Sequence, residues 1–234
     1  TLTFMPLALS SVGLICSMIG IFSVKLFSSK SPEVALRFGT MGASIIFIIA
    51  SYILIAQMNA SSNIWIAVLS GARGGIIIGL VTEYYTGGAP IRKIAKDGET
   101  GPATVIIAGL ATGMESVVIP VLTICAIILT ASHFAGLYGV GIAAVGMLGT
   151  VGITMAIEAY GTVAENAGRI AEMAKMGKST REITDSLAEV GHTTAAIGKG
   201  FAIGAAALAA LALLSAFIEK ITLDDPDFIL KLND

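Results

Sequence analysis

Residues 116–157 read SVVIPVLTICAIILTASHFAGLYGVGIAAVGMLGTVGITMAI, with no Asp, Glu, Lys or Arg among them. A helix needs roughly 20 apolar residues to cross the hydrocarbon layer of a bilayer. Three further stretches without a charge occupy residues 1–24, 38–72 and 200–218. A soluble domain has no physical reason to keep four such stretches. The sequence therefore predicts an all-α, polytopic transmembrane helix bundle.

The composition of the chain agrees with this prediction. Of its 234 residues 55% are hydrophobic and 13% are charged, and its mean hydropathy is +0.88. Soluble proteins carry about 25% charged residues. The net charge of −2 and the lack of a basic patch with interleaved aromatic residues argue against nucleic-acid binding. Cys16 and Cys125 lie in separate apolar stretches and are interpreted as small core residues.

Six helices are expected in a single transmembrane domain over residues 1–234. Their expected bounds are 2–24, 38–55, 64–85, 103–131, 137–175 and 183–218. No charged segment precedes the first apolar stretch, so that stretch is expected to be a span rather than a signal peptide. The chain begins at Thr1, and we expect it to be a fragment of a longer polypeptide.

The basic residues predict the orientation of the bundle. Cytoplasmic loops carry an excess of Lys and Arg. Ten of the fourteen basic residues fall in three alternate loops: Lys25, Lys30, Arg37, Arg92, Lys93, Lys96, Arg169, Lys175, Lys178 and Arg181. The intervening loops near residues 59–63 and 131–136 carry none. Loops 25–37, 83–102 and 165–192 are therefore expected to be cytoplasmic.

Three carboxylates recur at seven-residue steps in the expected helix 137–175. Glu158, Glu165 and Glu172 should share one helix face, because seven residues make nearly two turns. Carboxylates at the mouth of a membrane bundle are functional candidates by default. We assign a functional role to Glu158 and Glu165 and a solvated position to Glu172. The alternative for Glu165 is a simple ion pair with Arg169 at i+4.

Three further charges lie at or within apolar spans. Lys199 begins the last span, where it either extends to the interface or faces a polar cavity, and no phosphate-binding P-loop surrounds it. With Glu158, it is a candidate for ion transport or for the mouth of a site. Arg73 and Glu115 each have two open interpretations, a structural ion pair or an ion path. A helix kink is expected at Pro120.

Several motifs resemble a known family. They are GLVTEYYT at residues 79–86, GLYGVGIAAVGML at 136–148, EAYGTVAENAGRIAEM at 158–173 and GHTTAAIGKGFAIG at 191–204. These motifs resemble the membrane-integral, ion-pumping inorganic pyrophosphatases of the K⁺-dependent type. The resemblance implies that this chain holds about six, central, spans of the sixteen in that family.

The same resemblance implies an activity and its partners. The whole protein would be a primary pump that couples Mg-pyrophosphate hydrolysis to H⁺ or Na⁺ translocation across a lipid bilayer. It would be a homodimer that uses Mg²⁺ and K⁺. The residues that activate water would lie outside this chain, so we expect the chain alone to be insufficient for activity. Which ion is moved stays open.

The resemblance also implies residue roles. Glu165 stands at the position of a family Asp that binds Mg²⁺ and pyrophosphate, and His192 replaces an Asn in the same site. Ala195 and Gly198 match the residues of K⁺-dependent members, which implies K⁺ activation. Glu158 replaces another family Asp.

Two alternatives stay open at this point. Departures from the family pattern cluster at Glu158, Thr162, Glu165, Arg169 and His192, which favours a non-catalytic or degenerate module. An unrelated six-helix channel or transporter would predict a twofold internal repeat. The chemical motifs instead lie in the second half of the chain.

Overall fold

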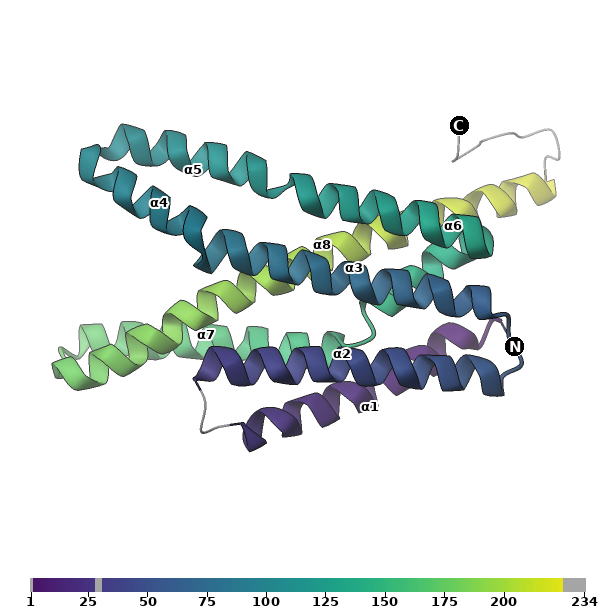
Figure 1. The fold of residues 1–234 in the computed structure, drawn as a ribbon, viewed down its shortest axis with the longest axis horizontal. Helices are drawn as coiled ribbons and strands as arrows, with labels where there is room; N and C mark the ends of the chain where they lie inside the picture. The colour runs from purple at the N-terminus through teal and green to yellow at the C-terminus, as the bar shows by residue number, and fades with distance from the viewer. Residues whose placement is uncertain (1, 28–30, 225–234) are drawn as a thin grey trace.

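The computed structural model describes residues 2–27 and 31–224 (Figure 1). Its elements are α1 (Met5–Leu26), α2 (Pro32–Gln57), α3 (Ser62–Gly87), α4 (Ala89–Asp97), a 3-10 helix η1 (Gly98–Thr100), α5 (Pro102–Ser116), α6 (Val118–Met147), α7 (Val151–Met173) and α8 (Lys178–Asp224). No strand occurs in these two described ranges. The predicted all-α class is confirmed.

Five helical segments of the described residues are long and apolar enough to cross a membrane. They are Met5–Leu26, Pro32–Gln57, Ser62–Thr100, Pro102–Met147 and Lys178–Leu223. The predicted polytopic transmembrane bundle is confirmed on this basis, with five such segments where six spans were expected. Helix α7 is not among them, because Glu158 and Glu165 interrupt its apolar residues.

The helix starts differ from the expected bounds where proline begins a helix. Helix α2 begins at Pro32, six residues before the expected start at residue 38. Proline suits the first helical position because it needs no N–H partner there. Lys25 and Arg37, two of the charges that suggested a loop, are helical instead, and Lys30 lies outside the described residues. Arg37 pairs with Glu33 one turn away at 3.5 Å.

The expected helix 103–131 is divided at Val117, between α5 and α6. Pro120 explains the interruption, because its ring clashes with the carbonyl of Ser116, four residues earlier. The helix is therefore interrupted three residues before the proline, near the position of the expected kink.

The expected continuous helix 137–175 is wrong. Its first part, 137–147, belongs to α6, which turns back on itself at Ala135 and Gly136. Gly136 has φ 62° and ψ −159°, a conformation that only glycine adopts readily. Its second part is α7, and residues 148–150 between the two parts are not α-helical. A Cβ on Gly13 of α1 would overlap the Gly149 carbonyl, so α1 packs directly against this interruption.

The segments expected as loops 83–102 and 165–192 are largely helical. The short helix α4 occupies the first of them, with Arg92, Lys93 and Lys96 exposed. Helix α8 begins at Lys178 rather than at residue 183. Ion pairs one turn apart, such as Arg181–Asp185 at 3.3 Å, support its first turns.

Helix α3 forms the centre of the bundle and packs most extensively against α6, then α8 and α2. A Cβ on Gly71 would overlap the Ala143 carbonyl of α6, and one on Gly75 would lie 2.8 Å from the Phe201 ring of α8. Small residues thus let three helices approach closely, which is how helices associate in lipid.

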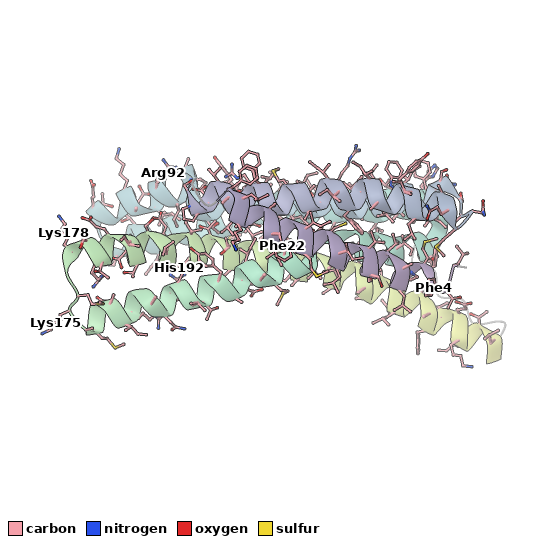
Figure 2. All side chains as sticks on the ribbon, turned by 90° about the horizontal axis from the view of Figure 1, so that it is seen from below. Phe4, Phe22, Arg92, Lys175, Lys178 and His192 are labelled. Carbon is pink, nitrogen blue, oxygen red and sulfur yellow. The ribbon has the colours of Figure 1, made fainter. Side chains whose placement is uncertain are left out.

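The three basic connections lie at one end of the molecule. In Figure 1 the end of α1 and the start of α2, the α4–α5 connection and the α7–α8 turn are all on the left, and the α2–α3 turn is on the right. Figure 2 shows Arg92, Lys175 and Lys178 at this end and Phe4 toward the other. The alternation of basic and non-basic loops therefore corresponds to two distinct ends.

Candidate functional site

Helices α7 and α8 form an antiparallel hairpin that crosses at two glycines. A Cβ on Gly161 would lie 2.7 Å from the Gly191 carbonyl oxygen, and a Cβ on Gly191 would lie 2.8 Å from the Gly161 carbonyl oxygen. Any larger residue would have to push the backbones apart. The motifs at residues 158–173 and 191–204 can therefore lie in contact, since neither has a side chain at the crossing.

The buried stripe of α7 determines where its carboxylates lie. It follows the helical period: Ile153, Ile157, Gly161, Ala164, Gly168 and Ala171. Glu158 and Glu165 each follow a member of this stripe by one residue, so both lie on the same flank of the helix. Glu158 and Glu165 are partly buried, and Glu172 is exposed, as expected.

On α8, too, a polar residue follows each of two buried positions. Gly191 and Gly198 are buried, and the residues after them, His192 and Lys199, are exposed. In an antiparallel pair of right-handed helices, the residue after a contact position turns to the same side of the pair on both helices. Glu158, Glu165, His192 and Lys199 therefore share one side of the hairpin, hereafter the open side. Figure 2 shows His192 along α8, toward the end with Lys175 and Lys178.

On the open side, Glu158 lies directly against Gly198. A Cβ on Gly198 would be 3.0 Å from the Glu158 Oε2 atom. A small cavity of about 120 Å³ is lined by Glu158, Gly198 and Lys199, with Thr154 of α7. No ion pair within 4.0 Å joins Glu158 to Lys199 in the described part of the chain. The lack of a side chain at Gly198 thus lets the Glu158 carboxylate lie directly against α8, next to this cavity.

The Glu165 carboxylate accepts a hydrogen bond from Arg169 Nη2 at 2.5 Å. The Glu165 side chain is 32% exposed and the Arg169 side chain 69% exposed. The ion pair foreseen as an alternative is therefore present. It is open to solvent, where such pairs contribute little stability.

The residues present fit Mg²⁺ only in part. Among the described residues no group of three or more His, Cys, Asp and Glu side chains could hold a metal. Magnesium takes oxygen ligands and is often bound through one or two carboxylates plus substrate phosphates. Glu165 fits the role of one such ligand. The imidazole of His192 suits a phosphate oxygen better than Mg²⁺.

The opposite side of the hairpin, hereafter the covered side, faces α2 and α3 across a cavity of about 650 Å³. Arg37 of α2 pairs with Glu83 of α3 at this cavity. Deeper in, the hydroxyls of Ser44 and Thr150 are 3.4 Å apart. The sequence analysis missed the Arg37–Glu83 pair. The available signal was that both charges border apolar stretches at the same end of the bundle.

The two charges inside other spans do not meet. Glu115 of α5 accepts a hydrogen bond from the Tyr85 hydroxyl at 3.2 Å. Arg73 of α3 is exposed, and none of the ion pairs among the described residues includes it.

The bundle defines a polytopic helical membrane protein. Its α7/α8 hairpin carries both acidic and basic side chains. The family model described as inorganic H⁺ pyrophosphatase matches residues 1–232. The chain belongs to this family, and the resemblance inferred from its motifs is confirmed. An unrelated channel or transporter is excluded.

Three relatives illustrate the match. Proteins of Clostridium tetani and Bacteroides thetaiotaomicron, both named "Putative K(+)-stimulated pyrophosphate-energized sodium pump", are 46% and 47% identical over 96% and 92% of this chain. A "K(+)-insensitive pyrophosphate-energized proton pump" of Methanosarcina mazei is 39% identical over 94% of it. The aligned part covers 35%, 32% and 34% of these relatives, so the chain spans about a third of their length.

Proposed function

We propose that this chain is the central part of a primary ion pump that couples Mg-pyrophosphate hydrolysis to H⁺ or Na⁺ translocation. One observation carries the proposal: Glu158, Glu165, His192 and Lys199 occupy the same side of the α7/α8 hairpin. A cytoplasmic position for loops 25–37, 83–102 and 165–192 would let pyrophosphate enter at the end where these residues lie.

On the open side, each residue has a distinct chemical task. Glu165 holds Mg²⁺, because a carboxylate needs a cation between itself and a phosphate. His192 donates an N–H to a phosphate oxygen, and Lys199 supplies a further positive charge nearer the apolar part of α8. Bound Mg²⁺ would neutralise phosphate charge and orient the leaving group. The groups that activate water come from outside this chain.

The space at Gly198 supports activation by K⁺. The cavity of about 120 Å³ lies beside Glu158 and Gly198, and Gly198 contributes no side chain to it. A monovalent cation there would supply the charge that a lysine supplies in K⁺-independent members. The more similar of the relatives above carry names that specify K⁺ stimulation, and the less similar one is named K⁺-insensitive.

A homodimer embedded in the lipid bilayer completes the proposal. Helix α5 has no buried residue, so its apolar surface is available to lipid or to another helix.

A second candidate is a non-catalytic or degenerate module of the same family. The Glu165–Arg169 ion pair favours it, because Arg169 occupies the carboxylate assigned to Mg²⁺. The pair is exposed and lies within one helix, so Mg²⁺ can displace it at a small cost. We therefore keep the catalytic assignment first.

The test compares this chain alone with a full-length protein that contains it. In the second, hereafter the chimeric pump, residues 1–234 replace the matching segment of the Clostridium tetani relative. Phosphate release from pyrophosphate is measured in membranes with Mg²⁺, with and without K⁺. We expect no release from the chain alone and K⁺-stimulated release from the chimeric pump. A folded but inactive chimeric pump would establish the non-catalytic module.

A further inference from the structure

Arg73 lies at the middle of a membrane-spanning helix. It is ten residues from Asn63 and ten from Glu83, which are near the two ends of α3. At 1.5 Å per residue, Arg73 is about 15 Å from each of these two residues along the helix axis. An arginine side chain is much shorter than that. The Arg73 guanidinium therefore cannot reach the aqueous interface along α3.

The surface around Arg73 is apolar. Ile77 and Leu80 lie one and two turns further along the same face of α3, and each is 43% exposed. Arg73 does not line either of the cavities described above. Its guanidinium thus has five N–H donors and, in the described part of the chain, no carboxylate within 4.0 Å.

A guanidinium in this position would be energetically costly if only lipid tails surrounded it. Ionised side chains inside membranes face a bundle interior or a water-filled cavity and pair with an opposite charge. A carboxylate matches the planar fork of a guanidinium with two parallel hydrogen bonds. Ile77 and Leu80 are apolar, so this face of α3 is suited to packing against another helix and not to lining a water-filled cavity.

We propose that the face of α3 formed by Arg73, Ile77 and Leu80 packs against another membrane-spanning helix of the full-length pump, one that places an Asp or Glu carboxylate on Arg73. The inference rests on the proposed function only in requiring a longer pump around this chain. We place the helix that covers this face outside residues 1–234. The acidic residues that the structure describes in this chain either pair with other residues or have no ion pair with Arg73.

Chemical linkage in the chimeric pump tests the proposal. Arg73→Lys keeps the charge and introduces a primary amine. A membrane-permeant carbodiimide then joins this amine to a neighbouring carboxyl group as an amide, and the carbodiimide takes up the released water as a urea. We expect mass spectrometry to find one linked peptide, between the segment around position 73 and an acidic segment outside residues 1–234.

Matched variants complete the experiment. Ile107→Lys places an amine on the apolar surface of α5, where Ile107 is 68% exposed, and should give no defined link. Arg73→Leu should lower the yield of monodisperse chimeric pump in detergent about tenfold, because it leaves a buried carboxylate without its partner.

Three outcomes would overturn the proposal. They are an unchanged or higher yield with Arg73→Leu, the lack of a linked peptide, and acylation of the introduced amine by a membrane-impermeant ester. The first two would assign the face to lipid, and the third to water. None of these measurements uses pyrophosphate hydrolysis, so an inactive chimeric pump can still confirm or refute the interface.

Discussion

The two sides of the α7/α8 hairpin are both polar, yet they differ in how their charges are balanced. On the covered side, Arg37 and Glu83 come from different helices and pair across a cavity. On the open side, Glu165 has only Arg169 on its own helix, and Glu158 and Lys199 are not paired with each other within the described residues. The covered side thus contains an ion pair between two helices, and the open side contains none among the described residues.

Under the proposed function, this difference separates a structural use of charge from a functional one. An ion pair between helices fixes their relative position and leaves neither group free for a ligand. Charges that share a side without pairing can bind ions from solution, as clustered groups in membrane proteins commonly do. Four experiments can break or sharpen this contrast.

The largest effect should come from neutralising a carboxylate on the open side. Glu165→Gln in the chimeric pump should lower kcat for pyrophosphate hydrolysis by about 100-fold or more, because the amide is a poor ligand for Mg²⁺. The control is Glu83→Gln on the covered side, which should change kcat by less than about threefold. Equal losses in both variants would remove the distinction between the two sides.

The next largest effect should come from a substitution at the Gly161–Gly191 crossing of α7 and α8, and it should appear in protein stability. Gly161→Ala places a Cβ 2.7 Å from the Gly191 carbonyl oxygen. We expect it to lower the free energy of unfolding by about 1–3 kcal/mol, seen as a lower Tm in detergent. Gly109→Ala is the matched control, because nothing lies within 4 Å of its Cβ. A Tm for Gly161→Ala at or above that of the control would show that the helices are not in backbone contact.

Breaking the ion pair of the covered side should have a smaller effect on stability. The Arg37 side chain is 47% exposed and Glu83 19% exposed, so solvent screens part of their attraction. Arg37→Gln should reduce stability by about 0.5–1 kcal/mol, measured by thermal unfolding at low and high salt. The loss should shrink at high salt, and a loss independent of salt would contradict an electrostatic role.

The smallest effect concerns Arg169. Removing it by Arg169→Ala frees Glu165 from an exposed pair of about 0.5 kcal/mol. The Mg²⁺ concentration for half-maximal activity should therefore fall about twofold in the chimeric pump. The control is Lys178→Ala, which breaks the exposed pair with Glu182 near the start of α8 and should leave this concentration unchanged. A rise with Arg169→Ala would show that Arg169 itself assists the ligand.

The sequence was sufficient for the fold class because apolar length is a one-dimensional property. It also identified the shared flank of Glu158 and Glu165, since a seven-residue step nearly matches two helical turns. The site roles of these residues, and of His192, Ala195, Gly198 and Lys199, remain predictions.

Other features depended on contacts distant in the sequence. The interruption at residues 148–150 lies inside one long charge-free stretch, so hydropathy could not reveal it, whereas the turn at Ala135 and Gly136 falls within the expected loop 131–136. The Arg37–Glu83 pair joins two helices, and one sequence does not show which charges meet. Helix α4 was missed because its exposed basic residues matched the pattern of a loop.

The glycine crossing has a consequence for how the chain enters a membrane. Helix α7 is not apolar enough to be a span on its own, whereas the segment Lys178–Leu223 that follows it is. Since Gly161 and Gly191 let the two backbones touch, α8 can provide α7 with a protein surface in place of lipid. We expect α7 to remain at the translocon until α8 has been synthesised, and the two helices to insert together as one unit.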